Sequence, residues 1–299
     1  MRIRVGRAGG KLAAQLGEIA AGRSAVPEPR DAATVVVIRP AGDGPAGNGQ
    51  AGAGPGLEAL MLRRTAAMKF APGAYVFPGG SVDQGDYSAD IGWHGPSPAE
   101  FGARLGAPAE VARALVCAAV RETFEESGLL LAGAPGGGPL TGLAERSEPP
   151  SWAADRLALA SGVLSLAELL NRRGLVVRAD LLVPWARWIT PEGEPRRFDA
   201  RFFVAAAPDG QVASGHAAES DHIAWLAPAA AISAAKAGEI SLLPPTATTL
   251  NDLASAVAAG SGMTGVLGAR RPIEPVQPRL VLEDDTAWLV LPDAVGYPL

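Results

Sequence analysis

The sequence has a single cysteine, Cys117, among 299 residues. No intramolecular disulfide can form, and a reducing cytoplasm is the compartment that we expect. Basic residues are also in deficit, because 26 Lys and Arg face 31 Asp and Glu and leave a net charge of −5. A general nucleic-acid binder presents a basic surface, so this composition disfavours that class of partner. No apolar run reaches the roughly 18 residues needed to span a bilayer, so we expect no membrane partner.

The composition favours one folded domain. Hydrophobic residues make up 48% of the chain and charged residues 19%, which suffices for a sizeable core. We expect a single domain over residues 32–299, with a loop-like insertion at 81–107 and a helical insertion at 147–180. Residues 1–31 form the expected N-terminal tail. Their basic, Ala-rich start is typical of a short helix or loose tail, and also of a transit peptide.

Residue patterns predict a mixed sheet with helices packed on it. Runs rich in β-branched and aromatic residues indicate strands, and a Gly/Ala/Pro linker separates the first two. The predicted strands are 33–40, 57–65, 74–80, 186–191, 200–208 and 222–228, with a terminal hairpin at 279–292. The predicted helices are 108–127, 152–161, 165–174, 229–239 and 244–260. The expected fold class is therefore α/β (α+β), with a mixed β-sheet sandwiched between helices.

Residues 118–131, AAVRETFEESGLLL, gather acidic residues on one face of the strongest predicted helix. Successive helical residues turn by about 100°, so Glu122, Glu125 and Glu126 share a face opposite Val120 and Phe124. These acids stand in the last turn, where the helix dipole disfavours negative charge, and no basic residue follows four positions later. Hard divalent cations prefer such oxygen ligands. We therefore expect Mg²⁺ or Mn²⁺ as a cofactor.

Residues 121–129, RETFEESGL, are similar to the second half of the Nudix box, REUXEEXGU, in which U is aliphatic. The first half, GX5E, resembles Gly80 to Asp86, with Asp86 in place of a glutamate; Thr123 occupies a U position. The motif places seven residues between its first acid and its arginine, whereas 34 lie between Asp86 and Arg121, an insertion of 27 residues. The resemblance implies the Nudix fold and a Nudix hydrolase.

A box interrupted at this point resembles the peroxisomal coenzyme A diphosphatase branch of that superfamily and its bacterial relatives. The resemblance extends from Ala32 to about Leu253. A coenzyme A signature that precedes FPGG in that branch is matched in part. Arg63 and Arg64 stand near its first arginine, and its histidine and glutamate are absent. The resemblance thus favours coenzyme A as the substrate.

The resemblance also implies roles for the box residues. Glu125 and Glu126 match the principal metal ligands of the family, and Glu122 matches a supporting ligand. Gly80 matches the glycine whose carbonyl reaches the metal. Arg121 matches the arginine that pairs with box carboxylates and orients them.

Candidate residues outside the intact half of the motif have alternative interpretations. Asp86 either replaces the first glutamate or is a loop acid or helix cap. A general base or further ligand is expected just before the strand at 222–228, where we favour Glu219 over Asp221; a solvated loop acid is the alternative. Three basic residues could bind substrate phosphates, namely Arg63, Arg64 and Lys69. The alternative is that they are exposed charges at a strand edge.

These features predict metal-dependent hydrolysis of a diphosphate that joins a nucleoside to another group. Coenzyme A or acyl-coenzyme A is the favoured substrate, with 3′,5′-ADP and (acyl-)phosphopantetheine as products. One alternative is a pyrophosphatase acting on NADH or ADP-ribose, and another is a non-catalytic nucleotide-binding domain. The expected partner is a small nucleotide or coenzyme A substrate, and a homodimer is an open alternative to a monomer.

Overall fold

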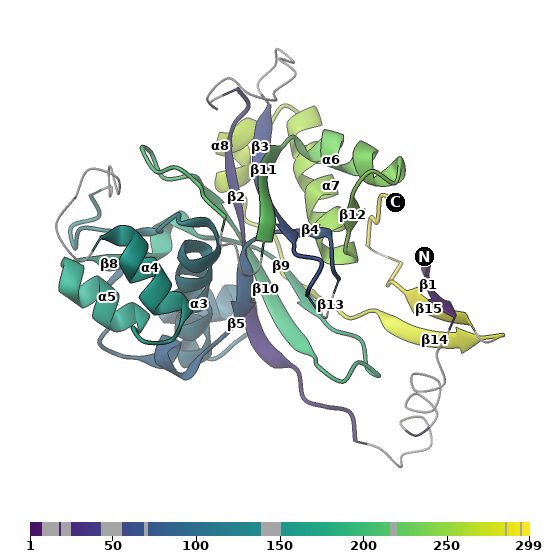
Figure 1. Cartoon of the computed structure of the whole chain (residues 1–299), viewed down its shortest axis with the longest axis horizontal. Coiled ribbons are helices and arrows are strands. Elements are labelled where there is room, and N and C mark those ends of the chain that lie inside the picture. The colour runs from purple at the N-terminus through teal and green to yellow at the C-terminus, as the bar shows by residue number, and fades with distance from the viewer. Residues whose placement is uncertain are drawn as a thin grey trace.

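A central mixed sheet lies between two groups of helices (Figure 1). The computed structural model of the protein describes residues 1–7, 18, 25–42, 56–68, 71–138, 151–215, 220–284, 286–293 and 295–299. The sheet has the order β12-β4-β3-β2-β10-β9-β13, with β11 paired to β3 and β5 paired to β2. Its strands are β2 (Arg30–Pro40), β3 (Leu57–Arg64), β4 (Ala74–Val76), β5 (Gly79–Ser81), β9 (Val183–Ile189), β10 (Phe198–Ala206), β11 (Ser220–Leu226), β12 (Ser241–Leu242) and β13 (Pro275–Val276).

Both parallel and antiparallel pairings occur in this sheet. Strand β10 runs parallel to β2 over nine residue pairs, from Phe198–Arg30 to Ala206–Ile38, and antiparallel to β9. Strand β3 pairs antiparallel with β11. Strand β2 pairs with β3 only over Ile38–Pro40, and over Ala32–Thr34 it pairs with β5 instead. The short strand β5, which begins the Nudix-like motif, is therefore fixed beside the start of β2.

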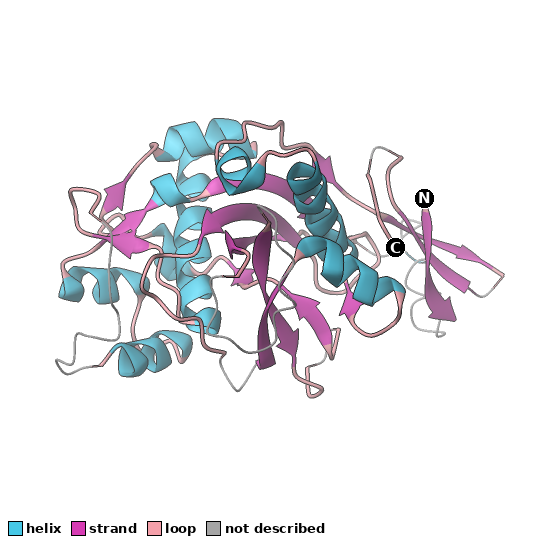
Figure 2. Cartoon of the chain, turned by 90° about the horizontal axis from the view of Figure 1, so that it is seen from above, coloured by secondary structure: helices cyan, strands magenta, loops and turns pink. Residues whose placement is uncertain are grey.

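The helices form a layer on each face of the sheet (Figure 2). The first layer contains α2 (Pro98–Leu105), α3 (Ala109–Ser127), α4 (Trp152–Ala160) and α5 (Leu166–Arg173), and the second contains α6 (Pro228–Lys236), α7 (Pro244–Ala258) and α8 (Gly262–Leu267). Short elements beside the first layer are the 3-10 helices η1 (Gln84–Tyr87) and η2 (Ala179–Leu181) and a small sheet of β6 (Trp93–His94), β7 (Ala132–Gly133) and β8 (Val176–Arg178).

The residues of β2 explain why both faces of the sheet are covered. Val35 and Val37 pack into the core beneath α3, whereas Val36 and Ile38 pack into the core beneath α6 and α7. Successive side chains of a strand point to opposite faces. An unbroken β-branched run therefore needs a hydrophobic partner on each side, and the two helical layers provide it. The predicted sandwich is confirmed.

The predicted helix at 108–127 is α3, and it ends where the sequence indicates. Gly128 follows it with φ 73°, and its N–H donates to the Phe124 carbonyl at 2.9 Å. Glycine adopts this left-handed conformation without a steric penalty. The remaining predicted helices correspond to α4, α5, α6 and α7, and the predicted terminal hairpin to β14 (Arg279–Glu283) and β15 (Thr286–Val290).

The structure adds α8 and several two- or three-residue strands to the predicted elements, and it differs from the prediction in three longer stretches. The stretch 81–107 was expected to be loop-like, but it contains η1, β6 and α2. Ser97 and Glu100 form a reciprocal capping box at the start of α2, which offsets the Gly/Pro-rich composition around it. The strand expected at 74–80 is two short strands, β4 and β5, separated by Phe77 and Pro78. Proline lacks the N–H that a continuous ladder requires.

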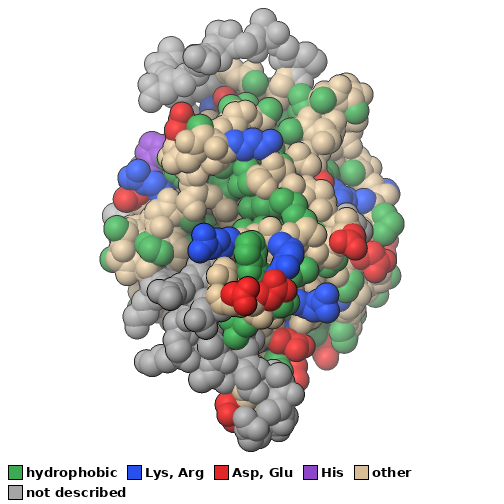
Figure 3. All heavy atoms as spheres, turned by 90° about the vertical axis from the view of Figure 1, so that its right-hand side faces the viewer, with side chains coloured by type: hydrophobic (Ala, Val, Ile, Leu, Met, Phe, Trp, Pro, Cys, Tyr) green, Lys and Arg blue, Asp and Glu red, His purple; other side chains and the backbone are tan. Residues whose placement is uncertain are grey.

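The third difference concerns the N-terminus. Residues Arg2–Arg7, expected in a tail or short helix, form strand β1, which pairs antiparallel with β15 beside β14. Figure 3 shows this end of the molecule, where acidic and basic side chains are interspersed. Arg2 pairs with Glu283 and lies over the Trp288 ring. In the described part of the chain, no helix is both long enough and apolar enough to cross a membrane.

Candidate functional site

The last turn of α3 carries the motif's carboxylates, and its two faces differ as the sequence predicts. Val120 and Phe124 are buried, whereas the side chains of Glu122 and Glu125 keep 14% and 15% of their surface exposed. Thr123 occupies a buried position where the motif has an aliphatic residue. Its hydroxyl donates to the Ala119 carbonyl at 2.7 Å, so burial leaves no unsatisfied donor there.

Arg121 is the hub of the site. Its Nε and Nη2 donate to the two carboxylate oxygens of Asp86 at 3.0 and 2.9 Å. Its Nη1 donates to Glu122 Oε1 at 2.9 Å and lies 3.5 Å from Glu125 Oε1, and Nη2 also donates to the Ser81 carbonyl at 2.9 Å. One guanidinium therefore ties the box helix to both the strand β5 and the 3-10 helix η1.

Asp86 meets Arg121 despite the 27-residue insertion between them. Its side chain is 1% exposed, and its Oδ2 also accepts from the Asp83 backbone N–H at 2.8 Å. The acid is thus both a capping residue of η1 and the partner of the box arginine. The inserted residues leave the motif's two halves in contact because they form α2 and the first part of α3, which pack together beside the sheet.

The glycines at the start of the motif allow a close approach to the acids. Glu126 Oε2 accepts from the Gly79 N–H at 2.9 Å. A Cβ at Gly80 would lie 2.4 Å from Glu122 Oε1, far inside van der Waals contact. A residue with a side chain at position 80 would therefore displace the Glu122 carboxylate. Gly79 and Gly80 thus lie against the carboxylates of Glu126 and Glu122, respectively.

Burial and opposing charges act together on the ionisable groups here. Burial by itself would lower the pKa of Arg121, but hydrogen bonding to Asp86 and the charges of Glu122 and Glu125 raise it above the ordinary value. Burial raises the pKa of Glu125, and the charge of Arg121 opposes this rise. The arginine therefore stays protonated and offsets part of the repulsion among the acids.

Arg156 supplies a second cation, which the sequence did not single out. From α4, its Nε donates to the Glu125 backbone carbonyl at 2.8 Å. Its Nη1 and Nη2 donate to the Ser214 hydroxyl and carbonyl, each at 2.8 Å, and the Ser214 N–H donates to the Ser127 carbonyl at 2.8 Å. A positive charge at a helix C-terminus is favourable. No local motif marks Arg156, because its partners lie 31 and 58 positions away.

Two of the remaining candidates, Arg63 and Asp221, pair with each other. Arg63 Nε donates to Asp221 Oδ1 at 2.7 Å, an exposed pair across β3 and β11, and Arg64 ends β3. The less favoured candidate base, Asp221, is therefore paired with Arg63, one of the residues predicted to bind substrate phosphates. Lys69 and the favoured base Glu219 lie outside the described residues. Their roles remain predictions.

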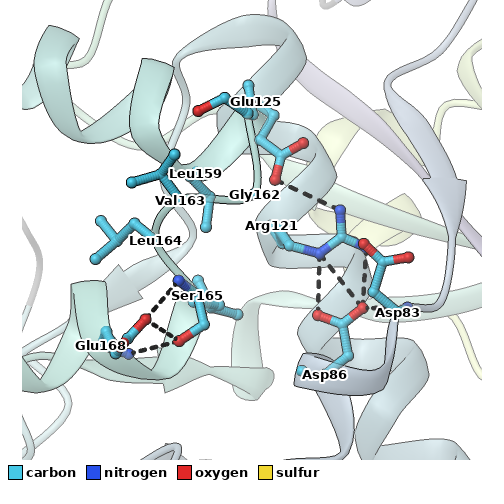
Figure 4. Close-up of a pocket in the computed structure, with 14 residues that line it drawn as sticks. Asp83, Asp86, Arg121, Glu125, Leu159, Gly162, Val163, Leu164, Ser165 and Glu168 are labelled. Carbon is cyan, nitrogen blue, oxygen red and sulfur yellow. Dashed lines mark hydrogen bonds and ion pairs between the residues drawn. The ribbon is translucent and has the colours of Figure 1, made fainter.

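A cavity of about 440 Å³ opens beside the motif (Figure 4). Asp83, Asp86, Arg121 and Glu125 line one side of it. The connection from α4 to α5, residues 159–168, lines the other. The predicted helical insertion therefore forms one wall of a pocket whose opposite wall is the box itself.

The donor chemistry of the box fits a hard divalent cation, since carboxylate and backbone carbonyl oxygens are the ligands available. Glu122 and Glu126 are one helical turn apart and face the Gly79–Gly80 segment. Within the residues described, no three acidic, histidine or cysteine side chains already converge on a single point. The box therefore contains suitable ligand types for such a cation. In this structure Glu122 accepts a hydrogen bond from Arg121, and Glu126 accepts one from the Gly79 N–H.

Comparison with known proteins decides the family. The profile of the NUDT19 Nudix domain matches residues 96–253, more than half of the chain. The chain belongs to the NUDT19 Nudix domain family. The crystal structure of a NUDIX hydrolase from Alicyclobacillus acidocaldarius superposes with a TM-score of 0.61 at 28% identity, covering 84% of this chain and 100% of that one. The predicted family and the Nudix fold are confirmed.

The chain is also similar to curated proteins named acyl-coenzyme A diphosphatase NUDT19, including those of Gallus gallus and Homo sapiens. The Gallus gallus protein is 31% identical over 258 residues, which cover 72% of this chain and 65% of that protein. The Homo sapiens protein is 31% identical over 223 residues, 64% of this chain and 58% of that protein. The chain therefore spans less than two thirds of the length of these relatives.

Proposed function

We propose that the protein hydrolyses the diphosphate of coenzyme A or acyl-coenzyme A, giving 3′,5′-ADP and (acyl-)phosphopantetheine. The observation that carries the proposal is the reassembled box. Arg121 joins Asp86, Glu122 and the Ser81 carbonyl in one network, even though an insertion divides the motif. The names of the Gallus gallus and Homo sapiens relatives support the coenzyme A substrate.

In this proposal Glu122, Glu125, Glu126 and the Gly80 carbonyl hold Mg²⁺ or Mn²⁺. A bound divalent cation would offset the negative charge of the diphosphate, whose repulsion otherwise slows attack by water. Arg121 holds the carboxylates in orientation through its hydrogen bonds.

Outside the box, we assign substrate-phosphate contacts and proton transfer to residues of the two flanking segments. Glu219 is the proposed general base. The proposed phosphate contacts are Arg63, Arg64 and Lys69. For Arg63, a phosphate would have to compete with Asp221, its partner at 2.7 Å. We propose the cytoplasm as the compartment, on the basis of the single cysteine, Cys117.

The proposal is tested by incubating the purified protein with Mg²⁺ or Mn²⁺ and coenzyme A, acyl-coenzyme A, NADH or ADP-ribose in turn, with mass spectrometry of the products. The test variant is Glu126→Gln. The matched control is Glu110→Gln, an exposed glutamate in the first turn of the same helix. We expect 3′,5′-ADP from coenzyme A, loss of at least about 100-fold in kcat for Glu126→Gln, and little change for the control.

The other possible outcomes would replace the proposed substrate, replace the proposed activity or refute the role of the box. Cleavage of NADH or ADP-ribose alone would keep the diphosphatase chemistry and replace the substrate. Binding of nucleotides without cleavage of any compound would favour the non-catalytic domain. Full activity of Glu126→Gln would refute the role of the box.

A further inference from the structure

The cavity beside the box has two chemically different walls. On the box side are Arg121, Glu125 and Asp86, at the end of α3 and in η1 (Figure 4). On the opposite side is the hairpin formed by the end of α4, the turn after it and the start of α5. At about 440 Å³, the cavity falls within the range of about 300–1,000 Å³ that is usual for small-molecule sites.

The hairpin wall is mainly apolar and ends in an exposed valine. Its apolar lining residues are Leu159, Ala160, Val163, Leu164 and Leu166. Leu159 and Leu166 are buried, whereas Val163 is 80% exposed at the turn that follows Gly162. An exposed branched aliphatic side chain at a pocket edge gains free energy when a ligand removes it from water. The wall is suited to an apolar or weakly polar chain.

Away from the metal ligands of the proposed function, the charges that line the cavity disfavour a phosphate group. Four lining residues are acidic (Asp83, Asp86, Glu125 and Glu168), and Arg121 is the one basic residue among the described residues that line it. The Arg121 guanidinium is already held by Asp86 and Glu122. A phosphate placed against the hairpin would face net negative charge, which like-charge repulsion disfavours.

The same lining is poorly suited to a nucleobase or a nicotinamide ring. None of the residues described along the cavity is aromatic, so neither wall offers a stacking surface. A flexible uncharged arm makes no such demand. Its methylene groups can cover Val163 and Leu164, and its amides can remain hydrated at the open side of the pocket.

We propose that the hairpin of residues 159–168 is the specificity element that binds the uncharged arm of the substrate, the acylated pantetheine chain. The assignment rests on the proposed function, which places the diphosphate at the box. The arm then leaves the box on the Glu125 side and lies against Val163 and Leu164. This arrangement favours coenzyme A derivatives over NADH and ADP-ribose, whose second groups are a ribose that carries a nicotinamide ring and a ribose alone, because the described residues of the wall include no aromatic residue for a ring and few polar groups for sugar hydroxyls.

The experiment compares Val163→Asp with a matched control, Val212→Asp. Val212 is 84% exposed in another segment and does not line the cavity, so both changes place the same charge on an exposed valine. Two substrates are used: hexanoyl-coenzyme A, and the methyl ester of 3′-phospho-ADP, which retains the diphosphate but lacks the arm. Binding of neutral S-hexanoylpantetheine is measured separately by calorimetry, which requires no hydrolysis.

We expect Val163→Asp to raise KM for hexanoyl-coenzyme A about ten-fold and to weaken S-hexanoylpantetheine binding by a similar factor. The methyl ester should be cleaved with unchanged KM, and Val212→Asp should resemble the wild type throughout. Equal effects of the two variants, or equal effects of Val163→Asp on both substrates, would overturn the assignment. A wild type that cleaves neither compound would instead refute the proposed function.

Discussion

The ion pair between Asp86 and Arg121 gives the sharpest test of how the divided box is held together. The perturbation is Asp86→Asn, which keeps the side-chain shape and one oxygen acceptor but removes the charge. Asp86 is 1% exposed and Arg121 is 7% exposed, so solvent screens the pair very little. The substitution also weakens the acceptor for the Asp83 N–H, which lies 2.8 Å from Asp86 Oδ2.

The expected loss of stability depends on which hydrogen-bond partners Arg121 retains after the substitution. Removing one partner of a buried ion pair costs about 3–5 kcal/mol when the other charge is left without compensation. Arg121 retains Glu122 and the Ser81 carbonyl, both at 2.9 Å. We therefore expect Asp86→Asn to lower the free energy of unfolding by about 2 kcal/mol, below that range. Asp86→Ala, which also removes the acceptor for the Asp83 N–H, should cost about 4 kcal/mol.

The assay is equilibrium unfolding in urea, followed by tryptophan fluorescence and far-ultraviolet circular dichroism. Asp90→Asn is the control, because Asp90 is an exposed acid in the same loop, and it should stay within about 0.5 kcal/mol of the wild type. Losses below about 1 kcal/mol for both Asp86 variants would show that the Arg121 network does not depend on this pair.

Three further predictions concern Arg156, Gly80 and Cys117. Arg156→Ala removes three hydrogen bonds at the end of α3 and should lower the free energy of unfolding by about 2 kcal/mol in the same urea assay. Arg156→Lys should recover less than half of that loss, because lysine lacks the guanidinium fork. An alanine variant as stable as the wild type would contradict this prediction. Gly80→Ala places a Cβ 2.4 Å from Glu122 Oε1 and should lower the free energy of unfolding by about 1–3 kcal/mol. Gly136→Ala is the control and should leave stability unchanged, because a Cβ there meets nothing within 4 Å. Burial raises the pKa of the Cys117 thiol to about 12. Because the thiolate is the reactive form, at pH 8 the folded protein should react with a disulfide reagent at least about 100-fold more slowly than the urea-unfolded chain. Equal rates would refute the burial of Cys117.

The box helix and its end were predictable because their causes are local. The repeat that places Val116, Val120 and Phe124 on one face occurs within a few turns, and Gly128 supplies the left-handed residue directly after the last turn. Helix α2 was equally local, since Ser97 and Glu100 form its capping box. The prediction of a loop rested on the Gly, Pro, Asp and aromatic residues of this stretch and did not use the capping box.

The connection of β4 to β5 and the pairing of β1 were less accessible to prediction. Phe77–Pro78 lies in an extended stretch, and only the neighbouring strand decides where the ladder breaks. The residues of strand β1 pair with residues of β15 that lie about 280 positions later in the chain. Its sequence, RIRVGR, alternates basic and apolar residues at first, as a strand does, but the stretch is short and its pairing partner lies at the other end of the chain.

The sequence by itself determined the family motif, the face on which the three glutamates lie and the need for a positive partner, because helical periodicity and the helix dipole act over a few residues. The motif already indicated Arg121 as a partner of these acids, but only the tertiary structure decided which groups on other elements join the network. Arg121 reaches Asp86 across 35 positions, and Arg156 reaches the Glu125 carbonyl across 31. These contacts form only when α3, α4 and η1 pack together beside the sheet, because side chains on separate elements have no fixed distance until the core between them is assembled.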